Sequence, residues 1–284
     1  MSRFPLERLL LGCSAAHAVL LVEPASAMPV LAGQVLVAEE RLPASASAAL
    51  AAALPGLTGR QPETPGPAAR NRSLIVTVDD GLARSFVVTP PRGTRGLREL
   101  RATAAARFAT LYGASADDWL LVGDWHARVP FIVSGLPRVL YQALQQLALS
   151  HGWRLDSVSP AFVRVWNGLG ASIPANGWLL VGFGSTLTLL ATGDDRIAGL
   201  RSLRLPAAPD LAALETLLEQ EILRAPAQLE RGRQALLWAG AAEWLPVATS
   251  LAGMASRTIA CRALASNAGE ASTAGQLALA GRSR

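Results

Sequence analysis

The chain has 284 residues, of which 51% are apolar, and a formal net charge of +5 at pH 7. That length leaves room for two domains of ordinary size, and the apolar content excludes a disordered chain. All 26 basic residues are arginines, so the sequence lacks the lysine that a Walker-A phosphate loop or a Schiff-base enzyme requires.

Two segments far apart in the sequence share one pattern. Trp178–Pro206 contains two apolar runs separated by glycines and hydroxyl residues, which predicts a β-hairpin or a three-stranded meander. Leu9–Val22 has the same layout, with an apolar strand on each side of a turn of small residues. Setting Gly12 on Gly182 aligns the flanking strands without gaps. Two such hairpins predict a duplicated α/β domain.

The rest of the chain alternates between predicted strands and predicted helices. Strands are expected at 34–39, 73–78, 84–89, 118–124, 131–136, 153–158, 235–240 and 257–262. Helices are expected at 44–54, 97–112, 136–150, 210–224 and 244–252, and a helix or a turn at 160–167. We expect a first domain over 1–170, with a Pro/Gly-rich loop at 58–72 and inserted α/β units, a second domain over 171–264, and a flexible tail over 265–284.

Few polar residues stand in a pattern that indicates chemistry. Asp79 and Asp80 are the candidates for a metal or catalytic site, but Asp-Gly is common in hairpin turns, which favours a structural role. No spacing supports a catalytic triad, a metal site or a disulfide. The histidines are isolated from one another, and we expect structural roles for His17, His126 and His151. Cys13 and Cys261 have no metal-ligand spacing, and a disulfide between them is possible but has no support in the sequence.

The arginines are spread along the chain, with one local cluster at Arg92, Arg95, Arg98 and Arg101. This cluster has no interleaved aromatic residues on which bases could stack, so we expect no nucleic-acid partner. The positive charge is instead favourable to acidic partners or to a membrane surface.

The first 27 residues allow two interpretations. Arg3 and Arg8 precede an apolar stretch, and Ala25-Ser26-Ala27 resembles a signal-peptide cleavage site that would leave Met28 as the new N-terminus. Against export, Gly12 and the small and polar residues after it interrupt the apolar stretch. No later segment reaches the ~18 uninterrupted apolar residues of a membrane span. We expect a cytoplasmic protein, with an exported binding protein as the alternative.

The order of a three-stranded meander, a helix, further β/α units and then the same layout again resembles the actin-like superfamily. The chain is similar in particular to PilM and to the cytoplasmic domain of type II secretion protein L. The similarity extends from about Leu9 to Cys261 and implies an α/β fold of two duplicated ribonuclease H-like domains, with mixed sheets flanked by helices. The segments that carry it are Leu9–Val22, Leu97–Gly113, Leu136–Gly152 and Trp178–Leu205.

Nucleotide-binding members of this superfamily carry Asp-x-Gly-Ser/Thr at each hairpin, where the acid organises Mg²⁺ and the phosphates. The place of that acid is taken by Leu10 in the first hairpin and by Gly182 in the second. We therefore expect a degenerate member without catalytic residues, a metal or a cofactor. The resemblance would place ATP and magnesium, if they bound, against Gly12, Ser14, Gly184, Ser185 and Thr186.

The resemblance implies a non-catalytic scaffold of a type IV pilus or type II secretion platform. Such a scaffold would bind a membrane-anchored partner, link it to the assembly ATPase, and lie peripherally at the inner membrane. Its contact surfaces would be the Arg92–Arg101 cluster and the groove between the two domains. One alternative is a nucleotide-binding switch or ATPase with an altered site that uses Ser14, Ser185, Thr186 and Asp79 or Asp80.

Overall fold

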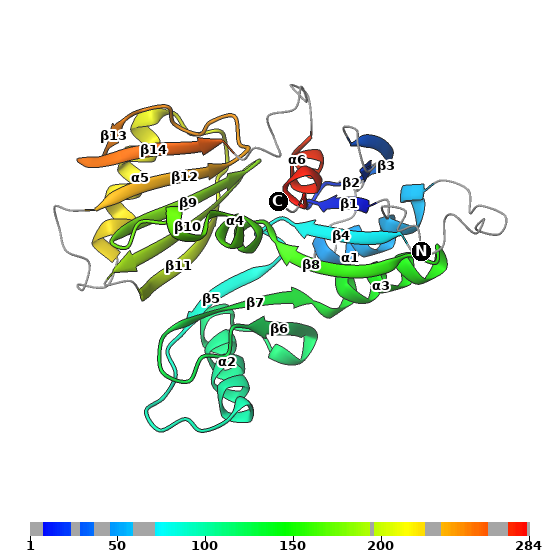
Figure 1. Ribbon diagram of the computed structural model, residues 1–284, viewed down its shortest axis with the longest axis horizontal. Coiled ribbons are helices and arrows are strands. Elements are labelled where there is room, and N and C mark those ends of the chain that lie inside the picture. Colours follow the sequence, from blue (N-terminus) through cyan, green and yellow to red (C-terminus); the bar gives the residue numbers. More distant parts are fainter. Residues whose placement is uncertain are drawn as a thin grey trace, which may run out of the picture. The chain divides into compact units, whose positions relative to one another are not determined.

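The computed structural model describes residues 8–23, 29–36, 46–58, 72–193, 196–224, 234–260 and 272–282. They form two compact units (Figure 1). One unit comprises the described parts of Met1–Leu82, Pro137–Arg164 and Arg262–Arg284, and the other those of Ala83–Leu136 and Val165–Cys261. Most of the loop expected at 58–72 and the expected strand at 257–262 beyond residue 260 lie outside the described residues.

The first unit is built on a five-stranded mixed sheet with the order β3-β2-β1-β4-β8. The first three strands form an antiparallel meander, whereas β1, β4 and β8 run parallel. The central strands are buried on both faces, as expected for parallel strands covered by helices. The strands are β1 Arg8–Cys13, β2 His17–Glu23, β3 Val30–Leu36, β4 Ser73–Val78 and β8 Arg154–Pro160.

The hairpin β1–β2 occupies residues 8–23 of the segment that we weighed as a signal peptide. Because β1 is the central strand, removing the first 27 residues would take the middle out of this sheet. The expected cleavage site at 25–27 lies outside the described residues.

Helices cover both faces of this sheet (Figure 1). Helix α3, Arg138–Ser150, buries Leu140, Leu144 and Leu147, the spacing that predicted it. It packs against α1, Ala46–Ala53, and the short 3₁₀ turn η1, Leu54–Thr58. The other face carries α6, Thr273–Ala280, which contacts β1 and β2.

The expectation of a flexible tail over 265–284 is wrong for residues 272–282, which contain α6. This helix begins at Ser272, whose hydroxyl accepts a hydrogen bond from the Gly275 amide, and it buries Ala274, Ala278 and Leu279. These side chains pack in one apolar cluster with Leu10, Val19, Leu21 and Ile75. The small residues of this segment, which suggested a flexible tail, allow α6 to lie close to the sheet.

The second unit repeats the strand order of the first in a six-stranded sheet, β11-β10-β9-β12-β14-β13. Strands β9, β10 and β11 form the antiparallel meander, and β9, β12 and β14 are parallel. The predicted duplication is therefore visible as a shared topology. The strands are β9 Gly177–Phe183, β10 Thr186–Gly193, β11 Arg196–Arg204, β12 Ala235–Gly240, β13 Ser250–Leu251 and β14 Met254–Ala260.

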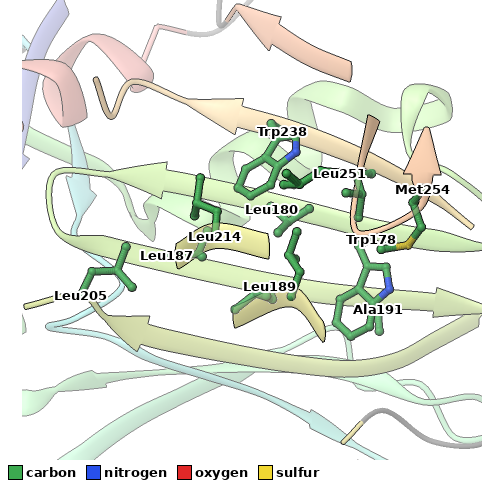
Figure 2. Close-up of a cluster of buried hydrophobic side chains, with 12 residues drawn as sticks. Trp178, Leu180, Leu187, Leu189, Ala191, Leu205, Leu214, Trp238, Leu251 and Met254 are labelled. Carbon is green, nitrogen blue, oxygen red and sulfur yellow. The ribbon is translucent and has the colours of Figure 1, made fainter. Parts of the chain in front are cut away.

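The core of this unit lies between the six-stranded sheet and α5, Leu211–Arg224 (Figure 2). Two buried tryptophans at its centre keep their indole N–H groups bonded, Trp178 to Gln234 at 3.0 Å and Trp238 to Ser256 at 3.2 Å. Asp210 caps α5 as predicted, because its carboxylate accepts a hydrogen bond from the Ala213 amide.

The two hairpins match at their first strands and differ at their turns. Gly12 and Gly182 are each the penultimate residue of a strand, but Gly12 pairs with Val19 and Gly182 with Leu187. The first turn is therefore two residues longer, and the expected alignment without gaps is wrong beyond the first strands.

A smaller three-stranded sheet, β5-β7-β6, also belongs to the second unit. It consists of β5 Arg84–Val88, β6 Trp119–Gly123 and β7 Phe131–Pro137, and it is covered by α2, Leu97–Tyr112. A short 3₁₀ turn, η2, Ala116–Asp118, leads into β6. An aromatic core holds α2 to this sheet through Phe86, Phe108 and Phe131.

The boundaries of the units differ from the expected division at residues 170 and 171. The segment Ala83–Leu136 lies with the second half of the chain, because β5 packs beside β11. The expected hairpin of 73–78 with 84–89 is also wrong, since β4 pairs with β1 and β8 whereas β5 pairs with β7.

Two further local expectations had different outcomes. Of the helix or turn expected from Pro160, the structure has the helix, α4, Ala161–Leu169, which continues into the 3₁₀ turn η3, Gly170–Ser172. The helix expected at 244–252 is wrong, because this segment is a loop that ends in β13. Among the described residues, no helix is both long and apolar enough to cross a membrane.

The contact between α6 and β1 depends on glycine at position 12. A Cβ atom added to Gly12 would lie 1.8 Å from the Ala274 carbonyl oxygen and 2.4 Å from the Ala278 nitrogen. Because both atoms are backbone, we expect Gly12→Ala to lower the free energy of unfolding by about 3 kcal/mol or more. Denaturant unfolding measures this, with Gly199→Ala as the control, because a Cβ at Gly199 meets nothing within 4 Å. Equal midpoints for the two variants would contradict the packing.

Candidate functional site

In open α/β sheets, ligands bind outside the carboxyl ends of the parallel strands, next to the point where the strand order reverses. In the first unit this edge lies after β1, β4 and β8, and it carries Ser14, Asp79 and Asp80. In the second unit it lies after β9, β12 and β14, and it carries the turn at Gly184 and Ser185. The residues predicted as cofactor ligands therefore lie at or near the two expected edges.

The first turn is closed on itself. The Ser14 hydroxyl donates to the His17 carbonyl oxygen at 3.2 Å and accepts from the His17 amide at 3.1 Å. The Ser14 amide donates to the same carbonyl at 2.8 Å. The Ser14 side chain is 6% exposed, so both its donor and its acceptor capacity serve the turn.

Gly12 lies in β1, not in the turn, and the backbone of α6 lies against it. Glycine is needed at this position because the two backbones approach each other so closely. Next to it, burial raises the pKa of the Cys13 thiol to about 12, so Cys13 is uncharged near neutral pH and poorly reactive.

Asp79 and Asp80 are both buried and both hydrogen-bonded to backbone amides. The Asp79 carboxylate accepts from the Gly81 amide at 2.6 Å, which is the bond of an Asx turn. The Asp80 carboxylate accepts from the Phe162 amide at 3.0 and 3.3 Å, and so caps the first turn of α4. Both carboxylates therefore have structural contacts, although not within the hairpin that the sequence analysis expected. Over the described ranges, no group of three or more His, Cys, Asp and Glu side chains could hold a metal ion.

The second turn is covered by the loop that follows β12. The Trp244 indole N–H donates to the Gly184 carbonyl oxygen at 2.7 Å, and a Cβ at Gly182 would lie 2.8 Å from the Trp244 ring. The amides of Ala241 and Ala242 donate to the Gly182 carbonyl at 2.9 and 3.1 Å. The loop that was expected as a helix is thus tied to this turn.

The two hydroxyl residues of the second turn have different surroundings. Ser185 is exposed, and its carbonyl oxygen accepts from the Leu205 amide at 2.7 Å. Thr186 is 6% exposed and begins β10. Gly184 has a φ of +51°, so this position requires the left-handed conformation that glycine tolerates.

These residues do not fit a magnesium nucleotide. The position of the first acid, Leu10, is fully buried in the apolar cluster under α6, and the position of the second, Gly182, is packed against Trp244. With neither carboxylate present, Mg²⁺ would lack these ligands. In the first turn the Ser14 hydroxyl and amide are bonded within the protein, whereas Ser185 in the second turn is exposed.

A partly buried cation beside the first edge, Arg164, was missed by the sequence analysis. The Arg164 guanidinium on α4 donates to the Thr77 hydroxyl at 3.1 Å, the Val76 carbonyl at 2.9 Å and the Ser157 hydroxyl at 2.8 Å. Burial lowers the pKa of Arg164 to about 10, so it remains charged at neutral pH. Its position among apolar residues of an amphipathic helix was the available signal.

A cavity of about 660 Å³ lies within the second unit. That volume is in the range of ordinary ligand pockets. It opens between the loop before β7, the segment from α4 to β9, and the β10–β11 hairpin. Its walls are apolar at Val129, Pro130, Ile173 and Ile197, with the exposed Asn167 and Arg196 adding polar groups.

Comparisons with known proteins identify the fold, through solved structures alone. No protein-family model matches the sequence, and no curated protein matches it. Solved structures do match. The cytoplasmic domain of EpsL, an inner-membrane component of the type II secretion system of Vibrio cholerae, is similar with a TM-score of 0.51 at 14% identity, covering 96% of this chain and 94% of that one.

Two other structures give the same result. The PilM-PilN type IV pilus biogenesis complex matches with a TM-score of 0.53 at 14% identity, over 89% of this chain and 88% of that one. A Bacteroides thetaiotaomicron protein with an actin-like ATPase fold and unknown function matches with a TM-score of 0.52 at 8% identity, over 85% and 86%. The chain has an actin-like fold and resembles PilM and the cytoplasmic domain of EpsL.

Proposed function

We propose that the protein is a non-catalytic scaffold of a type IV pilus or type II secretion platform. The fold supports this, because the structures it resembles include an inner-membrane component of a secretion system and a pilus biogenesis complex. The observation that supports the proposal is that the positions of both acids are occupied by packed residues of the chain, Leu10 in the apolar cluster under α6 and Gly182 against Trp244. A fold that keeps both halves of the duplication but lacks both acids is suited to bind another protein.

The scaffold would be cytoplasmic and would lie at the inner membrane through a membrane-anchored partner. It would connect that partner to the assembly ATPase and would use no nucleotide itself. The cavity of the second unit is the part of the described structure that suits a partner segment. Its apolar walls can bury two or three side chains of a peptide, and Asn167 and Arg196 offer polar groups that set its direction.

Titration with partner peptides tests the proposal. The peptides cover the cytoplasmic tails of inner-membrane pilus and secretion proteins encoded in the same genome, and isothermal calorimetry measures their affinity. We expect one tail to bind, and Ile197→Asp to weaken it at least tenfold, because a carboxylate would stand on an apolar wall. Val247→Asp is the matched control, since Val247 is 94% exposed and does not line the cavity. The proposal is contradicted if no tail binds to the wild-type protein.

Asp80 provides a separate test of its structural role. Removing its carboxylate leaves the Phe162 amide without this acceptor, and loss of a helix cap lowers the free energy of unfolding by about 1–2 kcal/mol. We expect this loss for Asp80→Ala and a smaller one for Asp80→Asn, which keeps an acceptor oxygen. Peptide affinity, measured below the unfolding temperature, should be the same in both variants. A stable Asp80→Ala variant that has lost peptide binding would instead place Asp80 in the binding site.

A further inference from the structure

Besides Arg84 on β5 and Arg107 on the third turn of α2, five exposed arginines belong to the small three-stranded part of the second unit. None of them makes an ion pair with any residue that the structure describes. They lie on the segment from β5 to α2, on the first two turns of α2, and on the loop between β6 and β7. We call this set the arginine face: Arg92, Arg95, Arg98, Arg101 and Arg128.

Helix geometry brings the members on α2 together. Leu100, Ala104 and Phe108 face the small sheet, and residues three apart lie side by side on a helix, so Arg98 and Arg101 share one flank. The Arg101 guanidinium lies 5.7 Å from the ring centre of Trp125, which joins this flank to the β6–β7 loop that carries Arg128. Arg107 projects from the opposite flank of α2 and is not part of the face.

The placement of these cations is unfavourable to the helix itself. The N-terminus of a helix carries partial positive charge, so arginines before and within the first turns of α2 destabilise it. Glu99 is the acidic residue of the first turn, and its carboxylate accepts a hydrogen bond from the Arg95 amide. The remaining positive charge would be neutralised by an external anion. Guanidinium groups suit phosphates because they donate two parallel hydrogen bonds.

We propose that the arginine face binds the anionic phospholipid headgroups of a membrane surface. Apolar side chains among the arginines favour this partner: Leu97 is 45% exposed next to Arg98, and Trp125 lies beside Arg101. Tryptophan is favoured at the level of the lipid headgroups, where its ring is partly buried and its N–H group remains hydrated. A strand of nucleic acid would need a series of stacking rings, and among the described residues Trp125 is the ring in contact with this face.

The inference deepens the proposed function, because a scaffold held at the membrane by its partner would gain a second contact with the bilayer. It can be tested without any partner. Each basic residue near an anionic surface strengthens binding about fivefold, the equivalent of ~1 kcal/mol. Replacing two of the five arginines by glutamate should therefore weaken binding by about 25-fold or more.

The experiment is flotation of the full-length chain with vesicles of phosphatidylcholine containing about one-third phosphatidylglycerol, at physiological ionic strength. We expect the wild-type chain to float with these vesicles and not with pure phosphatidylcholine. Arg92→Glu, Arg98→Glu should lose the interaction, and Arg107→Glu, Arg204→Glu should keep it. The control has the same change in net charge, at exposed arginines outside the face. Glutamates at the start of α2 stabilise the helix, because they are near its positive N-terminal end. The test variant should therefore unfold at the same temperature as the wild-type chain or at a higher one.

Three results would overturn the proposal: equal flotation with uncharged vesicles, equal flotation of the test and control variants, or loss of single-stranded DNA binding instead of vesicle binding in the test variant. The tail-peptide titration separates this inference from the proposed function. If the wild-type chain binds the peptide but floats with neither kind of vesicle, the lipid contact is contradicted and the proposed scaffold function remains.

Discussion

Close packing against two glycines is the constraint on which this structure depends. At Gly12 the partner is the backbone of α6, and at Gly182 it is the side chains of Trp244 and Leu245 in the loop after β12. Each glycine stands one residue before the end of the central strand of its sheet. A larger side chain at Gly12 would move α6 away from the sheet, and one at Gly182 would displace Trp244.

The same contacts support the proposal that the protein uses no nucleotide. Close packing in each half brings the chain's own groups to the edge where a ligand would bind. In the first half these are the α6 backbone, the self-bonded Ser14 turn and the amides that Asp79 and Asp80 accept from. In the second half it is the Trp244 indole on Gly184. In the first half the polar atoms of the turn are bonded without a ligand.

Local patterns in the sequence were enough to predict much of the fold. The amphipathic spacing of Leu140, Leu144 and Leu147 predicts α3, and the apolar runs around the two glycine turns predict both hairpins. The errors arise where a distant partner decides the structure. Asp79-Asp80-Gly81 is a good local hairpin signal, but β4 pairs in parallel with strands far from it in sequence.

The candidate site was predicted less well, for the same physical reason. Gly184 lies in the turn where the sequence analysis expected it, but Gly12 lies in β1, and the sequence alone does not show what lies against a glycine. The small residues of α6 have no local signature of burial, because alanine and glycine read equally as a flexible tail. Trp244 stands in a segment with helical composition, and its role depends on the turn of another strand. Arg164 likewise gains its partners from β4 and β8.

The measurement that tests the central claim most directly is thermal unfolding of the full-length protein with and without millimolar Mg-ATP. A ligand present at about 100 times its dissociation constant adds roughly 2.7 kcal/mol to the free energy of unfolding, which is a clear rise in the midpoint. Because both turns are closed by the protein's own residues, the account predicts no rise. A rise that disappears in a Ser185→Ala, Thr186→Ala variant would contradict it and would make the protein a nucleotide-binding switch.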